Sequence, residues 1–203
     1  MVPARSRFKP GETPLDAEIL ARVVKRDRRA LAVFFEHFYD RVYSHVVNLL
    51  RDRTLADDLT QDIFIRLQRT IESLDPGRDP AGWVFTVATN VVRDYWRSGE
   101  HRRRGQEVDL QQGGAGNVTH PDPDVQTALE HDEELRAVWA ALRELSLDDR
   151  EVILLRDYEE LPTAEIARML DLKPDAVRQR HSRAVARLAD IFTAGQDTER
   201  RPS

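Results

Sequence analysis

LPTAEIARMLDLKPDAVRQRHSRAVARLADIF, residues 161–192, is the stretch that decides the fold of the C-terminal part of the chain. It predicts a short helix capped by Thr163, a turn at residues 171–173 and a longer helix that begins at Pro174. Proline fits the first position of a helix, because the N–H that it lacks would have no partner there. A short helix, a three-residue turn and a longer helix have the spacing of a helix-turn-helix.

Apolar and basic residues lie on different sides of these two helices. Apolar positions that would face each other across the turn are Ile166, Leu170, Leu172, Val177, Ala184, Leu188 and Ile191. From Lys173 to Arg187 five basic residues stand against one acidic residue, a local net charge of +4 in a chain whose overall charge is -5. Charge alone leaves two interpretations open, a DNA-binding face or a solvated basic face, and the turn geometry favours DNA.

Composition restricts the class of protein. A chain of 203 residues with 40% hydrophobic content can build two small helical domains. It has no cysteine, which excludes disulfides, cysteine-bound zinc and thiol redox sensing. No apolar run approaches the roughly 20 residues that span a bilayer, and no signal-peptide core is present. We therefore expect a soluble, cytoplasmic protein without membrane insertion.

Residues 13–104 predict an N-terminal helical bundle, preceded by a flexible tail at residues 1–12. Thr13 and Pro14 are expected to open the first helix and Asp27 to cap the second. A third helix is expected to carry the apolar pattern on to Leu50. The fourth is expected to begin with a capping box at Thr54 and Asp57.

The fourth helix has an unusual polar face. Asp58, Gln61, Asp62 and Ile65 fall on one side of it, opposite its apolar stripe. An exposed isoleucine beside acids is a candidate protein-docking patch. A merely solvated face is the competing interpretation.

The fifth helix, expected from Pro80 to about Arg97, combines aromatic and basic residues. Trp83, Phe85, Tyr95 and Trp96 precede a cluster at Arg97 and residues 101–104. Aromatic rings that stack on bases, with arginines that follow phosphates, suit single-stranded nucleic acid. The alternative buries the rings in the bundle and leaves the arginines in water.

A composition change separates the two halves of the chain. Between Arg104 and Arg136 there is no lysine or arginine, and eight acids occur among glycines and prolines. Residues 105–124 are therefore predicted to be a flexible acidic linker. Residues 125–194 are predicted to form a second helical module, with Ser146 and Asp149 as a cap, followed by a flexible tail at residues 195–203.

DLTQDIFI, PAGWVFTVATNVVRDYWR, the acidic linker and a module ending in VRQRHSRA follow one another in an order that resembles bacterial RNA polymerase sigma factors of the extracytoplasmic-function group. The resemblance covers roughly residues 15–192. It implies an all-α chain in which a sigma-2-like bundle and a sigma-4-like four-helix module are joined by the linker.

The resemblance also implies roles for the N-terminal residues. The face formed by Asp58, Gln61, Asp62 and Ile65 would dock on the clamp helices of the largest polymerase subunit. The fifth helix would capture the melted minus-10 strand, with Asn90 beside a flipped base and Trp83 packed in the bundle. The other candidate minus-10 contacts are Arg93, Arg97, Arg102 and Arg103. Asp94 and Arg97 are expected to pair, although Arg97 could equally reach a phosphate.

The sigma-4-like module would read the minus-35 element as duplex DNA and contact the flap of the second-largest polymerase subunit. The candidate DNA contacts are Arg178, Gln179, Arg180, Ser182, Arg183 and Arg187, of which Arg180 and Arg187 are equally salt-bridge candidates. The family further implies an anti-sigma factor as a partner. Asp171 replaces the turn glycine of the family, and His181 and Ser182 replace bulkier residues, which leaves the minus-35 sequence open.

The main alternative is a free-standing helix-turn-helix regulator with an N-terminal sensor or dimerisation bundle. An enzyme has little support, because the six histidines show no metal-ligand spacing and no nucleophile or phosphate-loop motif is present. We therefore expect no catalytic residues, metal or cofactor.

Overall fold

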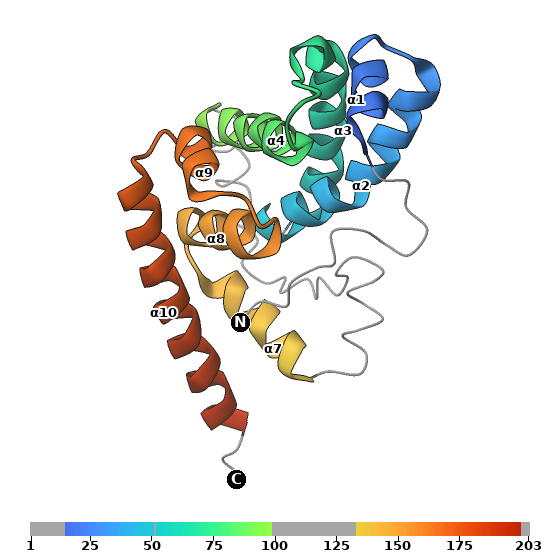
Figure 1. Ribbon diagram of the computed structural model, residues 1–203. Helices are drawn as coiled ribbons and strands as arrows, with labels where there is room; N and C mark the ends of the chain where they lie inside the picture. Colours follow the sequence, from blue (N-terminus) through green and yellow to red (C-terminus); the bar gives the residue numbers. More distant parts are fainter. Residues whose placement is uncertain (1–14, 51, 99–132, 200–203) are drawn as a thin grey trace. The chain divides into compact units, whose positions relative to one another are not determined.

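The computed structural model describes residues 15–50, 52–98 and 133–199, all of them helical or in short connections. They belong to two compact units. The N-terminal unit contains α1, α3, η1, α4 and most of α2, and the C-terminal unit contains α7, α8, η3, α9 and α10 (Figure 1). The fold is all-α, as predicted. No helix in the described ranges is long and apolar enough to cross a membrane.

The helices of the N-terminal unit begin close to where the sequence places them, but one cap differs. Their bounds are α1 Ala17–Val24, α2 Arg28–Leu50, α3 Arg53–Thr70, the 3₁₀ turn η1 Ile71–Ser73 and α4 Pro80–Arg97. Asp52 caps α3, so the expected capping box at Thr54 and Asp57 is wrong; Asp16 caps α1, whereas Thr13 and Pro14 lie outside the described residues. Each carboxylate stands directly before the first residue of its helix and accepts from the free N–H of Ile19 or Leu55, at 2.8 and 3.0 Å.

The second and third predicted helices are one helix, α2. No glycine or proline interrupts residues 28–50, and the buried stripe of Phe34, Phe38, Val42 and Val46 continues at a spacing of four. Asp27 caps this helix as predicted, accepting from the N–H groups of Arg29 and Ala30. The N–H of Ala30 is the main cause of the lowered pKa of Asp27.

A buried histidine lies in the core of the N-terminal unit. His45 on α2 is completely buried, with its ring centroid 5.2 Å from that of Phe85 on α4, and neither ring nitrogen has a hydrogen-bond partner. Burial disfavours the imidazolium and lowers the pKa of His45 from 6.5 to about 4. The neutral ring therefore serves as an aromatic core residue.

The C-terminal unit is built around α10. Its elements are α7 Glu133–Glu144, α8 Leu147–Ile153, the π-helical segment η3 Leu154–Tyr158, α9 Thr163–Leu170 and α10 Pro174–Glu199. The long α10 contacts α7, α8 and α9 (Figure 1). Val177 and Ala184 are buried on its inner side, and Ile166 and Leu170 are buried on α9. These four of the seven predicted apolar positions form the core, while Leu172, Leu188 and Ile191 are half-buried.

The corner between α7 and α8 is closed by Arg150. Its guanidinium donates to the carbonyl oxygens of Leu142, Arg143 and Leu145 at 3.1, 3.0 and 2.9 Å. Carbonyls in the last turn of a helix have no partner within the helix, and a cation is favoured at that end. Ser146 caps α8, as predicted, by accepting from the N–H of Asp149.

The helix-turn-helix has the predicted turn but lacks the predicted cap. No side chain caps α9, and the hydroxyl of Thr163 instead accepts from Arg156 of η3 at 2.6 Å. Asp171 ends α9 in the left-handed conformation, with φ 54° and ψ 47°, and the next N–H, of Leu172, donates to the carbonyl of Ala167. The α10 helix continues to Glu199, past the predicted tail start at residue 195, because no proline ends it.

The turn makes Asp171 a test of backbone strain. Asp171→Gly is expected to raise the free energy of unfolding by about 0.5 kcal/mol, since glycine adopts positive φ without a Cβ clash. Asp171→Ala is expected to lower it by about 1 kcal/mol relative to the glycine variant. Urea unfolding followed by far-UV circular dichroism measures both. Equal stability of the two variants would show that the turn does not impose the strain.

Burial of His45 predicts a loss of stability in acid. The unfolded chain binds the proton below its ordinary pKa of 6.5, whereas the folded chain resists it down to about pH 4. Stability should therefore fall by about 3 kcal/mol from this group as the pH drops through that window. His45→Leu should have a flatter pH profile than wild type in urea unfolding. Parallel profiles for wild type and His45→Leu would contradict the prediction.

Candidate functional site

The predicted docking face lies together on the exposed side of α3. Asp58, Gln61, Asp62 and Ile65 are all exposed, Ile65 to 38%. The opposite side of the helix is buried through Leu55, Leu59, Ile63 and Leu67. Steps of three and four residues keep the four exposed side chains on one surface. The face therefore combines two carboxylates, an amide and an accessible apolar side chain.

Next to α3, α2 contributes an aromatic group that the sequence pattern did not predict. Tyr39 is 52% exposed, and its ring lies 5.4 Å from Phe64 of α3 and 6.4 Å from Tyr43, to which it is parallel. Desolvation and then a hydrogen bond with Asp57 raise the pKa of Tyr43. The signal was present in the sequence as two tyrosines four apart, outside the Phe34–Phe38 stripe.

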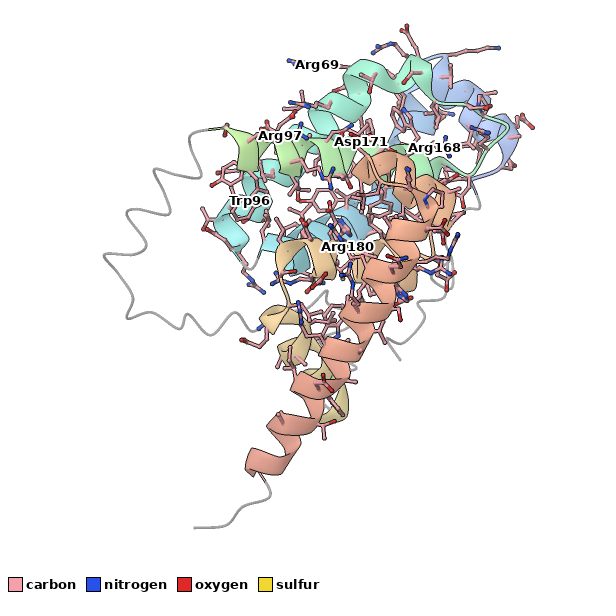
Figure 2. The ribbon with its side chains drawn as sticks, turned by 90° about the vertical axis from the view of Figure 1, so that its left-hand side faces the viewer. Arg69, Trp96, Arg97, Arg168, Asp171 and Arg180 are labelled. Atoms are coloured by element: carbon pink, nitrogen blue, oxygen red, sulfur yellow. The ribbon has the colours of Figure 1, made fainter. Side chains whose placement is uncertain are left out.

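The C-terminal half of α4 exposes part of the predicted minus-10 site. Asn90 and Arg97 are exposed, and Arg93 is half-buried. Tyr95 and Trp96 are half-buried and meet edge to face at 5.9 Å, and Figure 2 shows Trp96 and Arg97 near the end of the helix. Arg102 and Arg103 lie outside the described residues, as does the predicted acidic linker. The rest of α4 faces the core through residues such as Phe85 and Val92.

Two side chains of α4, Asp94 and Trp83, contact neighbouring elements of the N-terminal unit. Arg66 of α3 donates to Asp94 at 2.9 Å, so Asp94 pairs with Arg66 rather than with Arg97 as expected. Trp83 packs in the bundle as expected, with its ring 6.4 Å from Phe34 and its indole N–H donating to Ser73 at 3.1 Å. A partner on the neighbouring helix was not visible in the spacing along α4 alone.

The outer side of α10 carries four of the predicted minus-35 residues. Arg178, Gln179, Ser182 and Arg183 are exposed, and they lie away from the buried Val177 and Ala184. Arg178 also forms an ion pair with Asp175 in the preceding turn. Two arginines, an amide and a hydroxyl at helical spacing are the side chains that bind base edges and phosphates in a major groove.

The other predicted minus-35 residues contact carboxylates of the same unit. Arg180 donates to Asp148 at 2.9 Å and Arg187 to Asp149 at 2.8 Å. His181 Nε2 lies 2.7 Å from Asp157 Oδ2. The sequence left two roles open for Arg180 and Arg187, a DNA contact or a salt bridge. In the structure both residues form salt bridges.

One basic residue beside the turn was missed. Arg168 on α9 is exposed, and Figure 2 places it on the same helix that ends at Asp171. It forms an ion pair with Glu165 at 3.7 Å and donates to the carbonyl of Ala164 at 3.4 Å, both in its own helix. The first helix of a helix-turn-helix crosses the DNA backbone, so an exposed arginine there is a candidate phosphate contact. The part of the chain that the structure describes contains no cluster of three or more residues able to hold a metal ion.

Two family profiles match the chain in the order of the two units. Residues 34–103 match sigma-70 region 2, and residues 135–188 match sigma-70 region 4. The sigma factor SigK of Mycolicibacterium vanbaalenii is 29% identical over 181 residues, which are 89% of this chain and 90% of that protein. The chain belongs to the extracytoplasmic-function family of RNA polymerase sigma factors.

Other relatives agree with this membership. SigK of Mycobacterium tuberculosis is 29% identical over 179 residues, which are 88% of this chain and 93% of that protein. BldN of Streptomyces coelicolor is 28% identical over 180 residues, which are 86% of this chain but only 65% of BldN. All are described as extracytoplasmic-function sigma factors.

Two solved structures share the fold. CnrH in complex with the cytosolic domain of CnrY has a TM-score of 0.62 at 23% identity, covering 89% of this chain and 99% of CnrH. RpoE in complex with the anti-sigma factor NepR, from Bartonella quintana, has a TM-score of 0.58 at 21% identity, covering 80% and 96%. Sigma factors direct transcription initiation and are not enzymes, so membership assigns the chain to that process.

Proposed function

We propose that this sigma factor binds core RNA polymerase through the α3 face and positions two DNA-reading surfaces on a promoter. Asp58, Gln61, Asp62 and Ile65 would contact the clamp helices of the largest subunit, and the C-terminal unit would contact the flap of the second-largest. The exposed acidic face of α3 is the observation that carries the proposal, because a free-standing DNA-binding regulator has no need of it.

The minus-10 reader would be the exposed end of α4. Asn90 would bind a flipped base of the melted strand, while Arg93 and Arg97 would follow its phosphates, joined by Arg102 and Arg103. The half-buried pair of Tyr95 and Trp96 offers ring edges beside them.

The minus-35 reader would be α10, with Arg178, Gln179, Ser182 and Arg183 in the major groove. We place the two domains at residues 13–104 and 125–194, with residues 105–124 as the linker.

The weak basicity of the chain supports a role inside a larger complex. Its net charge of -5 gives no overall attraction to DNA, so polymerase would supply most of the affinity. We also propose action in the cytoplasm, where polymerase works, and control by an anti-sigma factor. RpoE of Bartonella quintana, which shares the fold, was solved with such a protein.

Substitutions on the α3 face test the docking role. Asp62→Asn is expected to weaken binding to core polymerase at least about tenfold, because truncating one partner of an interfacial charge pair costs roughly 2–5 kcal/mol. Gln61→Ala removes a neutral amide and is expected to weaken binding about tenfold, because it leaves a buried hydrogen-bond partner unsatisfied. Glu18→Gln on α1 neutralises another exposed carboxylate and should bind like wild type. Binding is measured by fluorescence anisotropy of labelled sigma factor titrated with core polymerase, and circular dichroism checks that each variant is folded. Wild-type affinity of both α3 variants would refute the docking role.

Promoter binding should depend on polymerase. The isolated chain is expected to bind promoter fragments at most about tenfold better than unrelated DNA, whereas the complex with core polymerase should show a specificity ratio of about 10³ or more. The fragments come from transcription starts mapped after overexpression of the chain. Filter binding at fixed salt compares the two states. Tight, specific binding by the isolated chain would instead support a free-standing regulator.

A further inference from the structure

Three carboxylates of the C-terminal unit meet α10 at three points. Asp148 and Asp149 in the first turn of α8 accept from Arg180 and Arg187 at 2.9 and 2.8 Å. Asp157 of η3 accepts from His181, with 2.7 Å between Oδ2 and Nε2. Figure 2 shows Arg180 on α10 near the middle of the unit. We call these three acids the carboxylate clamp.

The spacing along α10 separates two sets of polar residues. Arg180 and Arg187 are seven residues apart, two helical turns; Arg180 is half-buried on the side of α10 that carries the buried Val177 and Ala184, whereas Arg187 is exposed, one turn beyond Arg183. The exposed set, Gln179, Ser182 and Arg183 with Arg178, is related within itself by steps of three and four and lies on the other side. Rotation of α10 about its axis would therefore exchange which basic side chains face outward.

The π-helical segment brings the third acid into place. In η3 the N–H of Glu159 donates to the carbonyl of Leu154 at 2.9 Å, a span of five residues that inserts one extra residue into the helix. Consecutive side chains of this segment then contact both helices of the helix-turn-helix: Arg156 donates to Thr163 on α9, and Asp157 holds His181 on α10. One turn therefore ties α9 and α10 to the same support.

We propose that the carboxylate clamp sets the rotation of α10 about its axis and thereby decides which of its basic residues read DNA. Arg180, His181 and Arg187 hold the helix, while Arg178, Gln179, Ser182 and Arg183 face the minus-35 element. The inference rests on the proposed function, since it assumes that α10 reads duplex DNA. It makes Asp148, Asp149 and Asp157 positioning residues and removes Arg180 and Arg187 from the DNA contacts.

Burial supports this division at Arg180 and Asp149, while Arg187, whose side chain is 61% exposed, is held by its ion pair alone. The Asp149 side chain is only 16% exposed and that of Arg180 only 26%, so these groups have given up part of their water. If Arg187 turned to a phosphate, Asp149 would keep its charge in a half-buried place without its arginine. Each pair is weak by itself where it is exposed. Three such contacts along α10, however, fix the rotation of the helix about its axis, which a single pair would leave free.

A charge exchange distinguishes a holding arginine from a DNA contact. Arg180→Asp and Asp148→Arg, each alone, place like charges together, and the double variant restores the pair in reverse. With core polymerase and promoter fragments that contain the minus-35 element, each single variant should bind about tenfold more weakly, a typical cost of one misplaced base contact, and the double variant should return to within about threefold of wild type. If Arg180 contacts a phosphate, the double variant will stay as weak as Arg180→Asp, which overturns the proposal.

Salt dependence provides a second readout that a merely structural role would not change. The slope of log binding constant against log salt concentration should fall by about 1 for Arg183→Ala, which removes a DNA contact, and stay unchanged for Arg180→Ala. Equal losses of slope would assign Arg180 to the DNA. Fragments without the minus-35 element should not distinguish wild type from the single variants.

Thermal unfolding of the full chain tests the clamp without polymerase. Arg180→Asp and Asp148→Arg should each lower the Tm by about 2 °C, and the double variant should recover most of it. Absence of this coupling overturns the clamp itself. If the double variant recovers its Tm but not its promoter binding, the clamp exists but its positioning role is overturned. Failure of wild-type holoenzyme to recognise any mapped promoter refutes the proposed function, and with it the assignment of α10 as a reader.

Discussion

The C-terminal unit depends on a single guanidinium placed at the end of a helix. Arg150 satisfies three carbonyl oxygens where α7 ends and α8 begins, and so fixes the corner against which α10 packs. An arginine can do this because its planar fork presents several donors at once and is charged at every physiological pH. Lysine would offer fewer fixed directions. The position of the first turn of α8, and hence of Asp148 and Asp149, follows from this contact.

Charge segregation explains how an acidic chain can carry the two proposed DNA-reading surfaces. Acids on α3 and α8 either face outward on the proposed docking face or pair with arginines of the same unit. Exposed basic residues lie at the end of α4 and on the outer side of α10, and others, such as Arg28 and Arg69, lie on α2 and α3. Local fields of this kind act over about one Debye length, roughly 8 Å at physiological salt, so surfaces of opposite sign can coexist on one small protein.

Much of the fold could be predicted from the sequence, because helical periodicity and proline positions are local signals. Pro80 and Pro174 begin α4 and α10 as predicted. Caps were less predictable, since Asp16 and Asp52 compete with nearby threonines and only the backbone geometry decides. The exposure of the α3 and α10 faces followed from the same periodicity, and their binding roles stay predictions.

The missed features all depend on contacts between helices. Asp94 pairs with Arg66, 28 residues away along the chain, and Asp157 with His181, 24 residues away. Tyr39 belongs to an aromatic group because its ring contacts Phe64 on another helix. No residue type marks the π turn at residues 154–158 in the sequence. No periodicity along one helix reports such partners. Arg93 and Arg97 could be assigned to a face, but what surrounds them could not.

The ion pairs of α10 also bear on how such modules can be recombined. A recognition helix transferred from this chain into another sigma-4 domain would take Arg180, His181 and Arg187 with it and leave their carboxylates behind. The transplanted helix would carry the same base-reading side chains in the same order, yet it would lack the supports that orient it. On the proposed role of the carboxylate clamp, the exchangeable part is therefore the whole segment from α8 to α10, because Asp148 and Asp149 would contribute to the specificity of the helix that they hold.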